Sequence, residues 1–226
     1  MPPKYIIIVA AGKGIRTGWD LPKQFILLNG RPVLMHTISA FYDYDPSMRI
    51  ILVLPEDYTS HWSQLCSDYR FDIKCQIVAG GSTRFESVRR GLEKVEREAI
   101  VGIHDGVRPL IDRQLIAKLY ETAAIQKGAY PVIPLIDSIR EMQNPEESRA
   151  VDRSKYRLVQ TPQVFLSDIL IDAYKQKYKD EFTDDVSVVE AAQTIRPVMV
   201  EGSRENIKIT TQADLMIAET LMKCRI

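Results

Sequence analysis

A glycine-rich loop that carries Arg16 and is followed by Lys23 is the strongest candidate for chemistry in this sequence. Residues 10–16 read AAGKGIR and directly follow Tyr5–Val9, an apolar run that predicts a buried strand. Glycines let backbone N–H groups approach an anion closely, and a guanidinium matches phosphate oxygens. Two cations near one loop would stabilise the charge that develops as a phosphoryl bond breaks. We therefore predict a polyphosphate site, with an ordinary strand–turn–helix loop and a solvated lysine as the alternatives.

The loop matches neither of two well-known nucleotide-binding motifs. A P-loop would end in Gly-Lys-Ser or Gly-Lys-Thr, and this loop does not. A dinucleotide-binding GxGxxG loop would have a third glycine where Thr17 stands. It would also need an acidic residue at the end of the second strand, where Leu54 and Pro55 stand with Glu56 just beyond. The sequence therefore disfavours a dinucleotide-binding oxidoreductase.

Apolar, β-rich runs alternate with helical patterns in the first two thirds of the chain. The predicted strands are Tyr5–Val9, Arg49–Leu54, Ile73–Val78, Ile100–Ile103 and Ala129–Ile133. The predicted helices are Val33–Phe41, Tyr58–Tyr69, Arg84–Glu98 and Arg113–Lys127. This alternation predicts an α/β fold, a Rossmann-like open and mostly parallel sheet with helices on both faces. Ligands bind beyond the carboxyl ends of such strands, which is where the glycine-rich loop and Asp105 stand.

The pattern changes after Pro134. Strand-like runs at Leu135–Glu141 and Tyr156–Val159 flank a polar stretch, residues 143–152, that contains the turn signal Asn-Pro. This predicts a hairpin that leaves the body, and its apolar residues need a partner because a hairpin is not stable alone. Those residues are Ile136, Ile139 and Met142. A second copy of the chain is the simplest partner, so we predict a homodimer of one domain, residues 1–226, with a projecting arm at about 135–159.

The last part of the chain predicts four more elements. They are helices near Leu166–Tyr178, Asp184–Ala192 and Gln212–Cys224, and a strand at Pro197–Val200.

Composition excludes several classes of protein. The 226 residues include 30 Lys+Arg and 30 Asp+Glu, and this zero formal charge argues against a broad nucleic-acid surface. The first apolar run is too short to span a membrane, and no signal-peptide cleavage site follows it. The three cysteines form no CxxC pair and the three histidines no HExxH pair, which disfavours a disulfide framework and a zinc site. We expect a cytoplasmic protein with free thiols.

Six motifs, in order along the whole chain, resemble those of the IspD-type cytidylyltransferases. Enzymes of that family join CTP to 2-C-methyl-D-erythritol 4-phosphate in the non-mevalonate isoprenoid pathway. The motifs read AAGxGxR with PKQF (10–25), GGSTRxxSV (80–88), HDGVRP (104–109), QTPQxF (160–165), TDDxS (183–187) and EGxxxNIKIT (201–210). The third motif has Gly-Val where the family usually has Ala-Ala. The resemblance implies a nucleotidyltransferase fold of the GT-A-like type.

The resemblance also implies a role for individual residues. The CTP-binding residues would be Ala10, Ala11, Gly12, Gly14, Gly80, Gly81, Ser82 and Ser87. The catalytic cations would be Arg16, Lys23 and Lys208. The residues that bind the acceptor would be Asp105, Arg108, Ser138, Arg153 and Thr161, with Ser138 and Arg153 reaching the site of a partner chain. Mg²⁺ is the implied cofactor, held by substrate phosphates and by Asp105 directly or through water.

Several alternatives stay open on the sequence alone. Ribitol 5-phosphate is a second possible acceptor, because the ribitol-5-phosphate cytidylyltransferases share nearly all of these motifs. A catalytically silent nucleotide-binding subunit would have lost at least one of the three cations, and this chain keeps all three. Ser82 and Ser87 could cap a helix instead of contacting a base. Asp105 and Arg108 could form a purely structural salt bridge.

Overall fold

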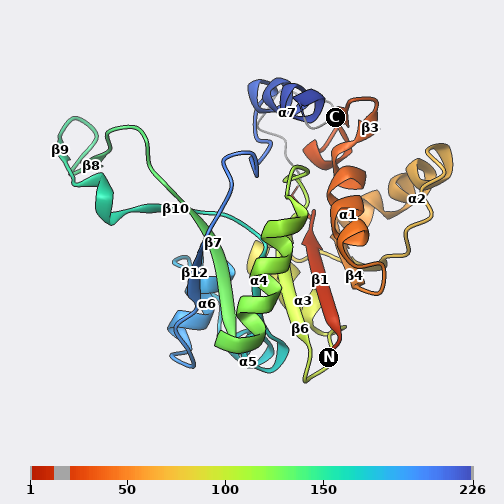
Figure 1. Ribbon diagram of the computed structural model, residues 1–226, viewed down its shortest axis with the longest axis horizontal. Helices are drawn as coiled ribbons and strands as arrows, with labels where there is room; N and C mark the ends of the chain where they lie inside the picture. The colour runs from red at the N-terminus through yellow and green to blue at the C-terminus, as the bar shows by residue number, and fades with distance from the viewer. Residues whose placement is uncertain (1, 13–20, 225–226) are drawn as a thin grey trace.

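A mixed, eight-stranded sheet forms the centre of the computed structural model, which describes residues 2–12 and 21–224 (Figure 1). Its strand order is β10-β7-β11-β6-β1-β4-β5, and β12, which lies outside this order, also pairs with β7. The bounds of the strands are Lys4–Val9 (β1), Arg49–Leu54 (β4), Gln76–Ala79 (β5), Ile100–Asp105 (β6), Gly128–Pro134 (β7), Arg157–Val159 (β10), Gln163–Leu166 (β11) and Val198–Glu201 (β12).

The strands around β1 run parallel, as the sequence predicts. β1 pairs with β4 and β6 in parallel, and β4 pairs with β5 in the same way. β6 is buried along its whole length and β1 along its centre, which is typical of parallel strands covered on both faces. β11 is antiparallel to β6 and β7, and β10 is antiparallel to β7. The prediction of a mostly parallel α/β sheet is confirmed.

Helices cover both faces of this sheet. Successive residues of a strand face opposite sides, so Ile6 and Ile8 of β1 belong to one apolar cluster and Ile7 to the other. The first face is covered by α1 (Val33–Tyr44), α2 (Thr59–Asp68) and α4 (Arg113–Gln126). The second is covered by α3 (Arg84–Leu92), α5 (Ser167–Ala173) and α6 (Asp185–Ala191). α7 (Gln212–Cys224) packs beside the small ribbon of β2 (Leu27–Leu28) and β3 (Arg31–Pro32).

The structure corrects three predicted elements. The third strand begins at Gln76, three residues after the predicted start, because residues 73–75 have no partner strand and β5 pairs only from Gln76. α3 ends at Leu92 instead of Glu98, since the N–H groups of Lys94 and Val95 turn back to the carbonyls three residues earlier. The helix expected from Leu166 is shorter, and β11 occupies the residues before it.

The hairpin after Pro134 projects from the sheet, as predicted, but its strands differ (Figure 1). They are β8 (Arg140–Met142) and β9 (Ser148–Ala150), so residues 135–139 are not a strand and part of the expected polar turn is one. Ile136 and Met142 are each 61% exposed, whereas Ile139 is half-buried. Two of the three apolar residues thus lack cover within their own chain. Among residues 2–12 and 21–224, the structure contains no helix with the length and hydrophobicity of a membrane span.

Candidate active site

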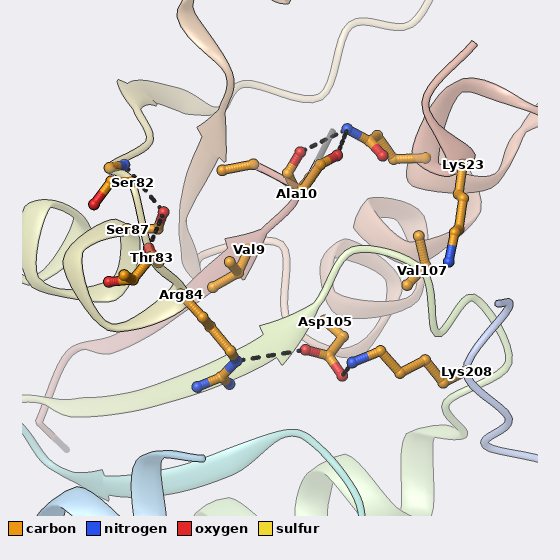
Figure 2. Close-up of a pocket in the computed structure, with 14 residues that line it drawn as sticks. Val9, Ala10, Lys23, Ser82, Thr83, Arg84, Ser87, Asp105, Val107 and Lys208 are labelled. Atoms are coloured by element: carbon orange, nitrogen blue, oxygen red, sulfur yellow. Dashed lines mark hydrogen bonds and ion pairs between the residues drawn. The ribbon is translucent and has the colours of Figure 1, made fainter. Parts of the chain in front are cut away.

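A cavity of about 630 Å³ opens where β1 and β6 end (Figure 2). This is the edge of a parallel sheet at which ligands are expected. The cavity brings together nine of the residues predicted from the sequence: Ala10, Ala11, Gly12, Lys23, Gly81, Ser82, Ser87, Asp105 and Lys208. The predicted Gly14 and Arg16 lie outside the described residues. Segments more than a hundred residues apart in the sequence therefore meet at one site, as the resemblance to the cytidylyltransferases implies.

The glycine pair at residues 80 and 81 allows unusually close packing beside this cavity. A Cβ added to Gly80 would lie 2.4 Å from the Cβ of Ala11, and one added to Gly81 would lie 2.4 Å from the Cβ of Glu86. α3 starts at Arg84, shortly after this pair, and its N-terminal cap is Thr83, whose hydroxyl accepts the N–H of Glu86 at 3.1 Å. Neither Ser82 nor Ser87 is therefore the cap.

Ser82 and Ser87 have other contacts within the chain. Ser87 is buried, and its hydroxyl donates to the carbonyl of Thr83 at 2.9 Å and accepts the N–H of Gly81 at 3.1 Å. Ser82 is exposed at the cavity wall. These contacts fix the shape of the loop, and they show that Ser87 supports the wall from behind with a hydroxyl that is already engaged.

Gln24 supports the glycine-rich loop, and the sequence analysis missed this role. Its side chain is buried, and Nε2 donates to the carbonyls of Ala10 (2.7 Å) and Gly12 (3.3 Å). Within the part of the chain that the structure describes, the N–H groups of Ala11 and Gly12 donate to no acceptor. Among the described residues, the loop is thus held with two unpaired amide donors, which suit an anion. The signal in the sequence was the glutamine that follows Lys23.

Lys23 and Lys208 approach the cavity from separate segments (Figure 2). Lys23 belongs to a short 3-10 helix, Lys23–Phe25, which the buried Phe25 and Gln24 anchor to the body. Lys208 follows the last strand, and its Nζ lies 3.0 Å from Asp105 Oδ2. Two ammonium groups on one cavity suit a polyanionic ligand.

Asp105 is the carboxylate at the end of β6, and three cations surround it. Arg108 Nε lies 3.2 Å from Oδ2, Lys208 Nζ lies 3.0 Å from Oδ2, and Arg84 Nε lies 3.8 Å from Oδ1. Burial raises the pKa of Asp105, but the charges of Arg84, Lys208 and Arg108 outweigh it and hold the pKa well below its usual value. The carboxylate is therefore ionised, and the local charge remains positive.

The residues around Asp105 also determine which ligands a metal ion could take at this site. Asp105 is the only acidic residue among the described residues that line the large cavity, and its oxygens already face cations. In the described ranges no group of three or more His, Cys, Asp or Glu residues could hold an ion. A divalent cation here would therefore take most of its ligands from substrate phosphates and water, as Mg²⁺ commonly does.

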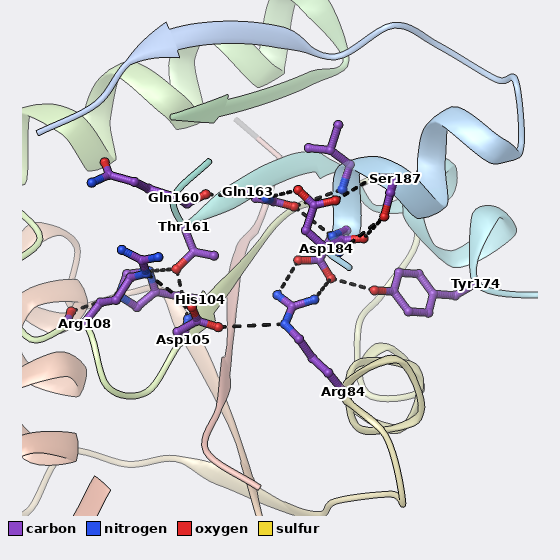
Figure 3. Close-up of polar contacts among 12 residues, drawn as sticks. Arg84, His104, Asp105, Arg108, Gln160, Thr161, Gln163, Tyr174, Asp184 and Ser187 are labelled. Atoms are coloured by element: carbon purple, nitrogen blue, oxygen red, sulfur yellow. Dashed lines mark hydrogen bonds and ion pairs between the residues drawn. The ribbon is translucent and has the colours of Figure 1, made fainter. Parts of the chain in front are cut away.

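His104 and Thr161 hold the backbone of Asp105 in place (Figure 3). The Thr161 hydroxyl accepts the N–H of Asp105 at 3.1 Å and lies 3.0 Å from His104 Nδ1. His104 Nε2 lies 3.1 Å from the carbonyl of Arg108, which can only accept, so Nε2 carries the proton and Thr161 donates to Nδ1. The Thr161 hydroxyl therefore already donates to His104 and accepts from Asp105, and its contact with Asp105 positions the backbone of that residue.

The pKa of His104 leads to a prediction about stability. Burial lowers it from 6.5 to about 4, because the charged imidazolium cannot be solvated there. The unfolded chain binds a proton at His104 near pH 6.5, whereas the folded protein binds it only near pH 4. His104 therefore does not lower the free energy of unfolding above pH 6.5, and it lowers it progressively as the pH falls from 6.5 toward 4. Between about pH 7 and pH 4, the unfolding free energy of the wild type should fall by about 3 kcal/mol more than that of His104→Gln. Urea unfolding at both pH values measures this difference, and equal losses in the two proteins would refute it.

A second cavity of about 240 Å³ adjoins the first. Arg84, Asp105 and Lys208 line both cavities, and Arg108 and Thr161 line only the second. Arg108 is buried, and its Nη1 donates to the carbonyl of Asn206 at 2.7 Å. Two of the residues predicted to bind the acceptor thus lie beside Asp105, across a shared wall from the larger cavity.

Ser138 and Arg153 lie elsewhere in the same chain. Both are exposed on the projecting arm, and neither lines either cavity. Arg153 donates to the carbonyl of Ile136, which ties the two sides of the arm together. The arm extends away from the carboxyl ends of β1 and β6 (Figure 1). The structure therefore does not bring these two residues to the site of their own chain.

Arg84 is a further residue of the site that the sequence analysis did not assign. Its guanidinium forms a bidentate pair with Asp185, with distances of 3.0 and 2.7 Å (Figure 3). Asp185 is fully buried and also accepts the hydroxyl of Tyr174 at 2.6 Å. Burial lowers the pKa of Arg84, but Asp185 and Asp105 outweigh it and keep the guanidinium charged. Arg84 therefore joins α3, α6 and the end of β6 at the wall between the two cavities.

Comparison with known proteins agrees with this geometry. Residues 5–224 match the family model "IspD: 2-C-methyl-D-erythritol 4-phosphate cytidylyltransferase". The chain is 52% identical to the 2-C-methyl-D-erythritol 4-phosphate cytidylyltransferase of Azobacteroides pseudotrichonymphae, with 98% of this chain and all of the relative (100%) covered. It is 51% identical to that of Phocaeicola vulgatus, with 97% and 99% covered.

Solved structures of similar proteins indicate the same family. The 2-C-methyl-D-erythritol 4-phosphate cytidylyltransferase of Thermus thermophilus superposes with a TM-score of 0.79 at 30% identity, covering 99% of this chain and 100% of the other. The 4-diphosphocytidyl-2C-methyl-D-erythritol synthase of Anaerococcus prevotii gives 0.82 at 26% identity, covering 98% and 96%. The chain therefore belongs to the IspD family of 2-C-methyl-D-erythritol 4-phosphate cytidylyltransferases and is a nucleotidyltransferase.

Proposed function

We propose that this protein joins CTP to 2-C-methyl-D-erythritol 4-phosphate, giving 4-diphosphocytidyl-2-C-methyl-D-erythritol and pyrophosphate. The observation that carries this proposal is the wall of Arg84, Asp105 and Lys208 shared by two cavities. A nucleotide in the larger cavity and a polyol phosphate in the smaller would have their reacting phosphates close to Lys208. The names of the relatives point to the same substrates.

The reaction needs alignment and charge stabilisation more than it needs an acid or a base. An oxygen of the acceptor phosphate attacks the α-phosphorus of CTP, the bond to the bridging oxygen of the β-phosphate breaks, and pyrophosphate leaves with that electron pair. Lys23 and Lys208, with Arg16 from the sequence, would stabilise the charge on the transferring group. The ionised Asp105 would accept a hydrogen bond from a polyol hydroxyl, with Arg108 beside it.

Mg²⁺ is the cofactor we propose. Bound to the triphosphate, it would neutralise phosphate charge and favour departure of pyrophosphate. The chain contributes the two cavity lysines, and Asp105 could contact the ion through a water molecule.

The choice of acceptor is tested by comparing two polyol phosphates. With CTP in excess, kcat/KM should be higher for 2-C-methyl-D-erythritol 4-phosphate than for ribitol 5-phosphate, because three relatives at 49% to 52% identity carry the first name. Pyrophosphate release at a series of acceptor concentrations measures both values. A higher kcat/KM for ribitol 5-phosphate would replace this proposal with the second candidate, a ribitol-5-phosphate cytidylyltransferase.

We also propose that the protein works as a homodimer joined through the arm at about residues 135–159. Exposed apolar side chains support this, because Ile136 and Met142 on the hairpin and Leu158 (50% exposed) on β10 need cover. Two-fold symmetry would bring the Ser138 and Arg153 of one copy to the acceptor cavity of the other. We propose that the chain is one domain with an arm. We also propose that it is cytoplasmic, because Cys66, Cys75 and Cys224 are free thiols.

The arm gives a prediction that separates shared from single-chain sites. Arg153→Ala should raise the KM for the acceptor far more than that for CTP, since a phosphate contact is lost only on the acceptor side. At acceptor concentrations far below the raised KM, Lys23→Ala and Arg153→Ala should each be nearly inactive alone and should recover activity toward about a quarter of wild type when their subunits exchange. About half of the dimers are then mixed, and each mixed dimer has one intact site. If fluorescence transfer proves exchange and no activity returns, each site is built within one chain.

A further inference from the structure

The loop of residues 80–82, between β5 and α3, uses its glycine N–H groups inside the protein. The N–H of Gly80 donates to the carbonyl of Leu54 at 2.7 Å. The N–H of Gly81 donates to Ser87 Oγ at 3.1 Å, and that hydroxyl donates its own proton to the carbonyl of Thr83. Neither glycine therefore offers a donor to a ligand, although Gly81 lines the large cavity.

The two donors of Ser82, the remaining residue of this loop, both go to one acceptor. Its N–H lies 2.8 Å and its hydroxyl 2.7 Å from Glu86 Oε2. These hydrogen bonds from Ser82 lower the pKa of Glu86, so the carboxylate is an ionised acceptor at neutral pH. Glycine at position 81 permits the contact, because a Cβ there would lie 2.9 Å from the same Oε2.

What remains on the 80–82 loop is a set of acceptors. The carbonyl of Gly80 accepts from Arg90 Nη1 at 2.8 Å. Within the described part of the chain, the carbonyls of Gly81 and Ser82 accept no hydrogen bond. Both residues line the large cavity, and Ser82 lies on the side opposite Lys23 and Lys208 (Figure 2). A ligand that meets this loop thus finds oxygen acceptors and no free N–H or O–H.

Cytosine and uracil differ at the atom that such a loop would distinguish. The 4-position of cytosine carries an amino group that donates, whereas that of uracil carries an oxygen that accepts. An acceptor that faces another acceptor leaves both unpaired, which is costly in a site shielded from water.

We propose that Glu86 determines the preference for CTP over UTP by withdrawing both donors of Ser82 from the nucleotide cavity. The carboxylate does not need to touch the base. It leaves the loop with acceptors only, so the loop can pair with the amino group of cytosine and cannot pair with the oxygen of uracil. This inference rests on the proposed function, since it requires the base to lie at this end of the cavity.

The test compares kcat/KM for CTP and UTP, with 2-C-methyl-D-erythritol 4-phosphate as acceptor, in the wild type and in Glu86→Ala. Alanine frees the N–H and hydroxyl of Ser82, which can then donate to uracil. The ratio of CTP to UTP should fall by at least about tenfold. Glu86→Gln keeps an oxygen that can accept both donors, so its ratio should remain within about threefold of wild type.

Further variants keep the test decisive. Adding Ser82→Ala to Glu86→Ala removes the freed hydroxyl and should restore part of the selectivity. Gly81→Ala should lower the ratio through displacement of the carboxylate, which covers the case in which Glu86→Ala fails to fold. Glu93→Ala, which changes an exposed glutamate at the C-cap of the same helix, is the matched control and should leave both values unchanged.

The outcomes separate this inference from the proposed function. An unchanged ratio in Glu86→Ala, with CTP still turned over, would overturn the role of Glu86 and leave the cytidylyltransferase intact. Equal loss of selectivity in Glu86→Ala and Glu86→Gln would also overturn it, because charge and not acceptor geometry would then be responsible. A wild type that turns over neither nucleotide would instead refute the proposed function.

Discussion

Lys23→Ala should lower kcat by about 10²–10³ while the fold stays intact. Lys23 lines the large cavity, and no described residue pairs with its ammonium group. Its charge is therefore available to the phosphates whose charge rises in the transition state, and its removal costs stabilisation there. The side chain is half-buried at the cavity and not in the core, so truncation leaves no apolar void.

Steady-state kinetics and a thermal melt of the same preparation measure this prediction. Lys177→Ala provides the matched control, because it removes an exposed lysine away from both cavities. The control should keep wild-type turnover. Near-wild-type kcat in Lys23→Ala, with a normal melting profile, would mean that the phosphates bind elsewhere.

Arg84→Ala should lower the unfolding free energy by about 3–5 kcal/mol. The substitution leaves the carboxylate of Asp185 buried without its bidentate partner, and a buried charge without a partner is strongly destabilising. Tyr174 still donates one hydrogen bond to Asp185, which is not enough to replace a guanidinium. Catalysis should suffer as well, since Arg84 is one of the three cations that face Asp105.

Urea unfolding measures this loss, and Arg97→Ala is its control. Arg97 also pairs with carboxylates, Asp168 and Asp172, but its side chain is 52% exposed. A surface pair of this kind contributes about 0–1 kcal/mol. Asp185→Asn in the Arg84→Ala background should recover part of the stability, because it removes the unpaired charge. Similar losses in Arg84→Ala and Arg97→Ala would contradict the structural role of the Arg84–Asp185 pair.

The central strands could be predicted because they are continuous apolar runs. β4 has the bounds expected from the sequence, Arg49–Leu54, and the predicted β1 differs by one residue. β11 could not be found in this way. It reads QVFL and continues directly into a helix, and its place between β6 and β7 depends on pairing with distant strands. Local periodicity carries no information about such pairing.

The strands of the arm were misplaced for a related reason. β8 and β9 are polar and exposed, so hydrophobic alternation does not mark them. Cross-strand contacts hold them, including the ion pair of Arg149 with Glu141 at 2.6 Å. The sequence nevertheless indicated where the hairpin turns, because Asn-Pro at 144–145 lies between the two strands.

Motifs identified the residues that face the cavity, but not the residues that hold them. Lys23, Asp105 and Lys208 were assigned from their place in the motifs and do line one cavity. Arg84 and Asp185 are 101 positions apart, and a contact over that distance leaves no periodic trace in a sequence. Thr161 was assigned to phosphate binding, and only the structure showed that its hydroxyl is engaged by Asp105 and His104.

Position-specific labelling of CTP shows whether the α-phosphate moves to the acceptor. The protein is incubated with Mg²⁺, 2-C-methyl-D-erythritol 4-phosphate and CTP labelled at either the α- or the γ-phosphate. The products are then separated and counted. We expect the α-label in a cytidine diphosphate ester of the polyol and the γ-label only in pyrophosphate, with both transfers reduced together in Lys23→Ala. A γ-label found on the polyol would indicate a kinase, and an α-label that remains in CMP or CDP would indicate simple hydrolysis; either result would contradict the account.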